Sequence, residues 1–114
     1  MKKASIQLNQ VRKTVNISVK GRMTMEDSQL FISEYNTKMN SIKASEYTLE
    51  VDCVDMPVVT PEMAEELKGG MGLYKSTGFN KVIFQIKGSS TLKMQLSRLA
   101  RNAGLTNATV EDIA

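Results

Sequence analysis

Histidine and tryptophan are absent from this chain of 114 residues, and cysteine occurs once, at Cys53. Without histidine, the sequence lacks the commonest general base, the commonest metal ligand and the proton acceptor of the usual nucleophilic triads. We therefore expect no catalytic residues and no enzymatic activity. A lone cysteine excludes a disulfide framework within the chain and fits a reducing cytoplasm.

Long apolar runs are also lacking. No segment approaches the roughly 18 consecutive apolar residues of a membrane span, and the opening MKKASIQLNQ has no apolar stretch typical of a signal peptide. We expect a cytoplasmic protein with no membrane contact. Hydrophobic residues make up 41% of the chain and charged residues 24%, as in ordinary globular proteins. The length fits one domain spanning residues 1–114.

Basic residues are missing from one acidic window. The net charge is +3, yet six of the twelve acidic residues fall between residues 50 and 66, where there is no Lys or Arg. The rest of the chain holds all 15 basic residues against the other six acids, which leaves it a net charge of +9. Such a charge separation can orient a binding partner, and a set of solvated faces would give it equally well.

Apolar and polar residues alternate in four short stretches, which is the period of a half-buried β-strand. These stretches cover residues 5–9, 14–20, 46–53 and 81–87. A short polar link joins the first two and indicates a hairpin.

A first helical pattern follows Thr24, which is a good N-cap. It places five residues at helical spacing: Leu30, Phe31, Tyr35, Met39 and Ile42. This spacing predicts that the five residues form the buried face of the helix.

Two further helices follow. One opens with Thr60 as its N-cap and Pro61 at its first helical position, and Gly78 is placed to end it. The other runs from about Ser90 to Ala103. The tail that follows predicts a short strand or a turn of helix.

The predicted order is therefore ββαβαβα, an α/β fold. A strand, a helix and a strand in sequence favour a parallel, right-handed crossover. Strands covered on both faces read as continuous apolar runs, but these strands alternate. We therefore expect a two-layer sandwich, with a mixed sheet and helices mainly on one face.

The stretch GGMGLYKSTG, residues 69–78, looks like a phosphate-binding loop at first sight. Such a loop needs a glycine directly before its lysine, a strand before the loop and a helix after it. Here Tyr74 precedes Lys75, a helical segment comes before and a strand follows. We predict that the glycines lie inside the second helix and allow close packing against a neighbour. They should cost that helix roughly 1 kcal/mol each relative to alanine.

The centre of the chain carries a family resemblance. LEVDCVDMPVVTPEMAEEL and, after it, YKSTGFNKVIFQIKGSSTLKMQLSRLARNAGL resemble the STAS domain of anti-sigma factor antagonists, as does Gly21 before the first helix. The likeness covers most of the chain. It implies a STAS-like fold and a regulatory protein, from a bacterium or a phage, that binds a kinase or a sigma-regulatory protein.

The functional motif of that family, Asp-Ser-Ser-Gly, falls here on Val58, Val59, Thr60 and Pro61, and only Thr60 keeps a hydroxyl. The resemblance implies phosphorylation of Thr60, whereas the Thr-Pro pair alone predicts an ordinary helix cap. We predict that partner binding uses the following residues: Asp55, Met56, Val58, Val59, Thr60, Glu62 and Met63, with Met23 and Met25 as a flank. These methionines either form an adaptable contact surface or fill the edge of the core.

The sequence gives weaker evidence for a metal site or a reactive thiol. Glu50, Asp52 and Asp55 are either ligands for a hard cation or a solvated sheet face, and we expect no metal and no cofactor. Cys53 alternates with core residues and has no histidine to activate it, so we predict a buried, inert thiol.

Nucleic-acid binding is the main alternative to a protein partner, since the isoelectric point is near 9.1. The basic residues concerned fall towards the hairpin and on the last helix: Lys2, Lys3, Arg12, Lys13, Lys20, Arg22, Lys93, Arg98 and Arg101. An aromatic content of 5% speaks against it, because bases need stacking platforms. A third class is a structural component of a phage or cell that assembles through the open face of the sheet.

Overall fold

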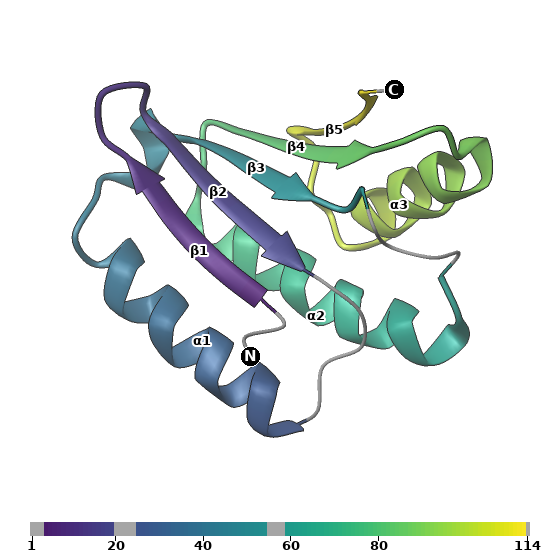
Figure 1. Ribbon diagram of the computed structural model, residues 1–114, viewed down its shortest axis with the longest axis horizontal. Coiled ribbons are helices and arrows are strands. Elements are labelled where there is room, and N and C mark those ends of the chain that lie inside the picture. The colour runs from purple at the N-terminus through teal and green to yellow at the C-terminus, as the bar shows by residue number, and fades with distance from the viewer. Residues whose placement is uncertain (1–3, 20–24, 55–58, 114) are drawn as a thin grey trace.

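A computed structural model describes residues 4–19, 25–54 and 59–113 of the chain (Figure 1). Within these ranges the protein has five strands and three α-helices. Their order is β1 Ala4–Asn9, β2 Thr14–Val19, α1 Met25–Met39, a 3-10 turn at Ala44–Glu46, β3 Thr48–Asp52, α2 Pro61–Thr77, β4 Lys81–Ile86, α3 Ser90–Asn102 and β5 Ala108–Asp112. The tail is therefore a strand, the first of the two alternatives.

The five strands form one mixed sheet in the order β1-β2-β3-β4-β5. β1 and β2 form the predicted antiparallel hairpin, and every later pair is parallel. Each parallel crossover moves one strand further in the same direction, so crossovers of one hand place all their helices on one face. Figure 1 shows the three helices on one side of the sheet, which gives the two-layer α/β arrangement.

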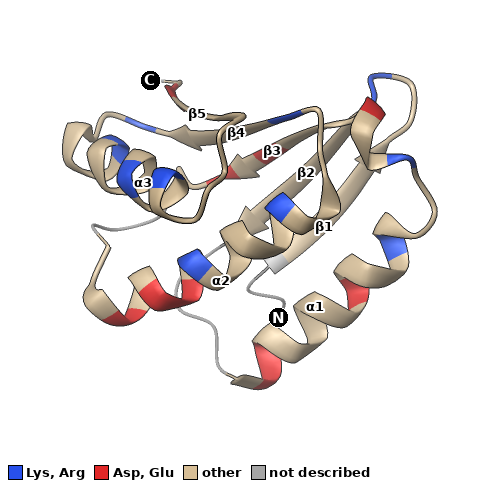
Figure 2. Ribbon diagram, turned by 180° about the vertical axis from the view of Figure 1, so that it is seen from behind, with Lys and Arg blue, Asp and Glu red and all other residues tan. Residues whose placement is uncertain are grey.

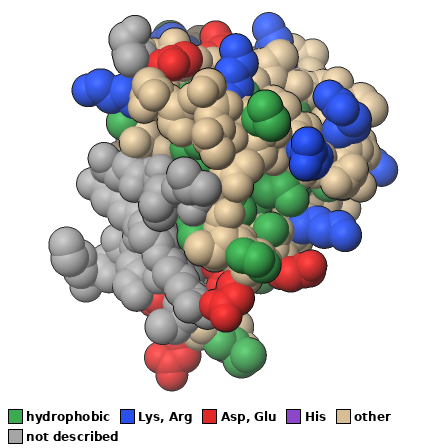
Figure 3. Space-filling view, turned by 90° about the vertical axis from the view of Figure 1, so that its right-hand side faces the viewer, with side chains coloured by type: hydrophobic (Ala, Val, Ile, Leu, Met, Phe, Trp, Pro, Cys, Tyr) green, Lys and Arg blue, Asp and Glu red, His purple; other side chains and the backbone are tan. Residues whose placement is uncertain are grey.

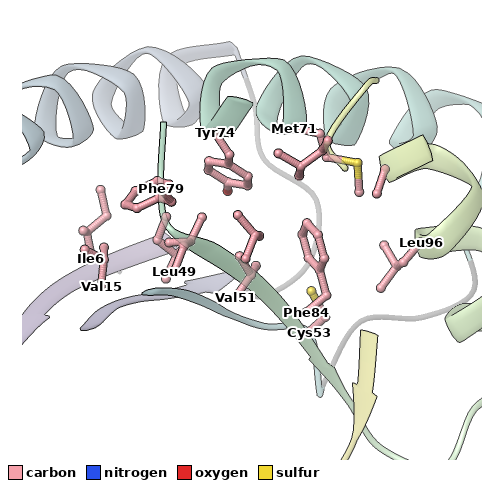
Figure 4. Close-up of a cluster of buried hydrophobic side chains, with 14 of the residues drawn as sticks. Ile6, Val15, Leu49, Val51, Cys53, Met71, Tyr74, Phe79, Phe84 and Leu96 are labelled. Carbon is pink, nitrogen blue, oxygen red and sulfur yellow. The ribbon is translucent and has the colours of Figure 1, made fainter. Parts of the chain in front are cut away.

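The alternating pattern of the strands is explained by the register. Four neighbours across the sheet all point into the core and are buried: Ile6, Ile17, Val51 and Phe84. The opposite face carries the paired residues Asn16, Glu50 and Ile83, which none of the described helices covers. Figure 4 shows the buried side chains meeting those of the helices. Burying one such large apolar side chain contributes about 1.5–3 kcal/mol.

α1 is held to α2 through aromatic side chains. The ring of Tyr35 lies 6.0 Å, centre to centre, from both Phe31 and Tyr74. The Tyr35 hydroxyl lies 2.5 Å from Oγ1 of Thr77, which itself donates to the carbonyl of Leu73. Because Thr77 has only one hydroxyl proton, Tyr35 must be the donor in this pair. These contacts fix α1 against the middle of the helical layer.

The prediction for Leu30 was wrong. Phe31 and Tyr35 are buried, but 71% of Leu30 is exposed. Successive helical residues are rotated by about 100°, so Leu30 lies outside the narrow arc through which α1 contacts the sheet. The predicted cap of this helix, Thr24, lies outside the described residues.

The predicted role of the helical glycines was also wrong. Gly69, Gly70 and Gly72 lie within α2 as expected. Among the described residues, however, a Cβ added to Gly69 or Gly72 would meet no atom within 4 Å, and one added to Gly70 would make only an ordinary contact of 3.9 Å with the hydroxyl of Tyr74. They therefore do not permit a close approach within this chain. Gly78 does have the predicted role, because it ends α2 in the left-handed region at φ 81° and its N–H donates to the carbonyl of Tyr74.

Candidate functional site

The structure brings together part of the predicted binding set. Val59, Thr60, Glu62 and Met63 lie on the segment that enters α2, and we call them the α2 entry surface. Four predicted residues lie outside the described residues: Asp55, Met56, Val58 and Met23. Met25 begins α1 and is 79% exposed, so it does not fill the core edge.

The chain leaves β3 in a fixed geometry. The N–H of Cys53 donates to the carbonyl of Gln85 at 2.8 Å, which extends the contact between β3 and β4 by one residue. The carboxylate of Asp52 accepts from the N–H of Val54 at 3.0 Å. Asp52 is thus engaged locally at the end of its strand.

Val59 is held by a side chain that sequence reasoning missed. Oε1 of Gln95 accepts from the Val59 N–H at 2.9 Å, and Nε2 of Gln95 donates to the Val59 carbonyl at 3.1 Å. One amide on α3 therefore satisfies both backbone groups just before α2. Since the partners are backbone atoms 36 residues away, the residue types gave no signal for this pair.

Thr60 is the N-cap of α2. Its Oγ1 accepts from the N–H of Met63 at 3.3 Å, and its carbonyl accepts from the N–H of Ala64 at 2.9 Å. The side chain is also exposed, so the cap does not bury the hydroxyl. The geometry of Thr60 is therefore that of an ordinary cap in a place that a modifying enzyme could reach.

The first two turns of α2 are acidic on their outer side. Glu62, Glu65 and Glu66 are exposed and follow the i, i+3, i+4 spacing of one helix face. We call these three residues the α2 acidic face, and Figure 2 shows acidic residues on the first turns of α2, at the same end of the molecule as α3. A negative charge added at Thr60 would meet the positive helix end and these acids together.

Cys53 is fully buried at the end of β3. Burial, with a smaller contribution from the charge of Asp52, raises the pKa of its thiol from 9.0 to about 12. The thiolate, which is the nucleophile, is therefore strongly disfavoured. The structure therefore confirms that the thiol of Cys53 is buried, as predicted.

The acids on the open face do not converge. Glu50 and Asp52 are half-buried on neighbouring outward positions of β3. Among the residues that the structure describes, no group of three or more His, Cys, Asp or Glu side chains could hold a metal ion. The third acid of that proposed set, Asp55, lies outside them.

The two basic groups lie apart in the fold. The hairpin turn with Arg12 and Lys13 is at the β1–β2 edge of the sheet, whereas α3 follows β4 and contacts β5 at the other edge. Figure 2 shows them at opposite ends of the molecule. Lys13 is further engaged by Glu46 at 3.7 Å and by the ring of Tyr47. The hairpin turn and α3 do not form one continuous basic surface.

No protein family, characterised protein or solved structure gives a significant match to this chain. In the described part of the chain, none of the helices is both long and apolar enough to span a membrane.

Proposed function

We propose that this protein is a non-enzymatic, cytoplasmic interaction module with a STAS-like fold, which binds a protein partner through the α2 entry surface. The main support for this proposal is that the α2 entry surface is exposed and is also held in place by hydrogen bonds to the rest of the fold. Gln95 fixes Val59, Thr60 caps the helix, and the neighbouring side chains of Thr60 and Glu62 remain open to solvent. A pre-organised surface of this kind loses little conformational entropy when it binds.

Phosphorylation of Thr60 is the proposed control of this binding. It rests on the resemblance to anti-sigma factor antagonists and on the exposure of Thr60. A phosphate would add roughly −1.5 to −2 charge beside the acidic face of α2, and would so change the electrostatic match to any partner.

A protein partner is favoured over nucleic acid by the charge arrangement. The basic helix α3 is next to the acidic face of α2, and phosphates approaching the one would be repelled by the other. The hairpin turn cannot extend the basic surface, because it lies at the opposite sheet edge.

Site-specific photo-cross-linking in a lysate of the source cell tests the proposal. A photo-reactive amino acid replaces Glu62 in one sample and Asn16, on the open face of the sheet, in the control. We expect one protein species to be cross-linked from position 62 and not from position 16. Equal cross-linking from both positions, or none from position 62, would contradict the proposed surface.

Two variants of Thr60 then test the switch. Thr60→Ser should keep the cross-link, and Thr60→Glu should lose it if charge at this position controls binding. If both variants capture the same protein, the proposed binding surface is retained and the proposed control by phosphorylation of Thr60 is rejected. Capture that disappears after nuclease treatment would assign the surface to nucleic acid instead.

A further inference from the structure

α3 has one buried face and one basic face. Leu92, Leu96 and Ala100 are buried against the sheet. The exposed residues of the helix include four that we call the α3 outer face: Lys93, Met94, Arg98 and Arg101. Met94, Arg98 and Arg101 follow the i, i+4, i+7 spacing of a single stripe opposite the core.

The cations of the α3 outer face are exposed. No Asp or Glu occurs between residues 87 and 110. Within the described residues, no ion pair or hydrogen bond engages the side chains of Lys93, Arg98 or Arg101. Met94 is 63% exposed at the N-terminal end of this stripe. Arginine and methionine are residue types enriched in protein interfaces, where lysine is depleted.

A face of opposite charge lies next to this stripe. α2 and α3 are in contact, and Gln95 joins α3 to the residue before Thr60. The middle of α3 therefore lies near the start of α2, which carries the α2 acidic face. Figure 3 views the molecule from this side, where basic side chains gather at the right and acidic ones lie below them.

Two neighbouring patches of opposite sign are self-complementary. A two-fold rotation that brings a second copy against this side places each acidic patch on the basic patch of the other copy. We propose that a second copy of this chain docks here. Arg98 and Arg101 of each copy then face Glu65 and Glu66 of the other.

This self-association goes beyond the proposed function, because its paired charges Glu65, Glu66, Arg98 and Arg101 lie outside the α2 entry surface, although the α2 acidic face shares Glu62 with that surface. The contact is small and charged, so it belongs to the weak, transient class of interfaces. The attraction between opposite charges at a surface is screened over a distance of about 8 Å at physiological salt. At higher salt this distance is shorter still. The dimer should therefore form at low ionic strength and dissociate as salt is added.

Sedimentation equilibrium of the full chain tests the proposal. At about 50 mM salt the mass should approach twice the monomer mass of 12.6 kDa, and at about 500 mM salt it should return to one monomer. The double variant Arg98→Glu/Arg101→Glu and the double variant Glu65→Arg/Glu66→Arg should each be monomeric at low salt. Lys81→Glu, an exposed charge reversal on β4, should leave the dimer unchanged.

Mixing the two double variants is the decisive measurement. One variant then carries two acidic patches and the other two basic patches, so a 1:1 complex of about twice the monomer mass should form. This rescue cannot come from misfolded proteins. A monomeric wild type at both salts, or a mixture that stays monomeric, would overturn the proposal. Gel-shift of a mixed-sequence DNA by the wild type but not by Arg98→Glu/Arg101→Glu would overturn it in favour of nucleic acid.

Discussion

Cys53 carries a thiol but lacks an environment that would activate it. Its side chain is fully buried, and burial with the charge of Asp52 raises its pKa to about 12. Reagents such as maleimides need the thiolate and access to it. At pH 8 we expect labelling of the native protein to be at least about 100-fold slower than labelling in urea, because it requires opening of the structure. Fast labelling of the native protein would show that the end of β3 opens readily.

Variants of Thr60 separate the contribution of the helix cap to stability from any effect on binding. Thr60→Ala should lower the free energy of unfolding by about 1 kcal/mol, because the N–H of Met63 loses its acceptor. Thr60→Ser should change it by only a few tenths of that amount, since serine caps equally well. Urea unfolding measures both. If Thr60→Ala is neutral, the exposed cap bond contributes nothing in water.

Two of the three glycines within α2, Gly69 and Gly72, give a prediction at the level of the element. Gly69→Ala and Gly72→Ala should each raise the free energy of unfolding by about 0.5–1 kcal/mol, because the added methyl group meets no atom and glycine is a poor helix former. Gly78→Ala is the matched control. It should be destabilising, because Gly78 has a positive φ that alanine adopts only with strain. Thermal or urea unfolding of the three variants tests this prediction. A loss of stability in Gly69→Ala or Gly72→Ala would mean that the added methyl group meets a neighbouring atom after all.

Gln95 joins α3 to the entry of α2. Gln95→Ala should cost about 1–2 kcal/mol, because the N–H and the carbonyl of Val59 both lose a partner. Amide exchange at Val59 should accelerate by more than exchange at the buried strands. Met94→Ala is the control on the same helix, because its side chain is exposed. Equal exchange at Val59 in wild type and Gln95→Ala would mean that the bonds do not hold the segment.

The elements were predictable where a local rule decides them. The alternation of apolar and polar residues predicted the bounds of β2 and β4 to within one residue. The Thr-Pro pair and Gly78 predicted the two ends of α2. Pattern could not assign Leu30, because helical spacing alone does not show how wide an arc of α1 the sheet covers. Gln95 was missed because a polar side chain that bonds to distant backbone leaves no periodic signal.

For the whole molecule, the sheet must protect two edges. Lys38 of α1 donates from Nζ to the carbonyl of Ile6 at 2.6 Å and pairs with Glu34 at 3.2 Å. The outward carbonyl of edge strand β1 is thereby occupied, which hinders pairing with another sheet. The open face is polar where Asn16 and Glu50 pair, so it does not favour assembly through that face.

The core also predicts how the whole protein responds to alkali. Burial raises the pKa of Tyr35 from 10.0 to about 12, and burial also raises the pKa of Tyr74 and Cys53. The unfolded chain loses these protons at lower pH than the folded protein does. Because the unfolded thiol has a pKa of 9.0 and the unfolded tyrosines one of 10.0, stability should be unaffected by these groups below about pH 8. It should then fall as pH rises towards 12, by about 1.4 kcal/mol per pH unit for each proton that only the folded state retains.

Urea unfolding between pH 8 and pH 11 measures this slope, and Tyr35→Phe isolates one proton. The variant loses the bond to Thr77, so at pH 8 it should be less stable by about 1 kcal/mol. Its stability should then fall less steeply above pH 10, because one of the protons retained by the folded state is gone. The two curves should converge as pH rises, whereas general repulsion among deprotonated surface groups would lower both in parallel. Parallel curves would mean that Tyr35 ionises without unfolding the contact between α1 and α2.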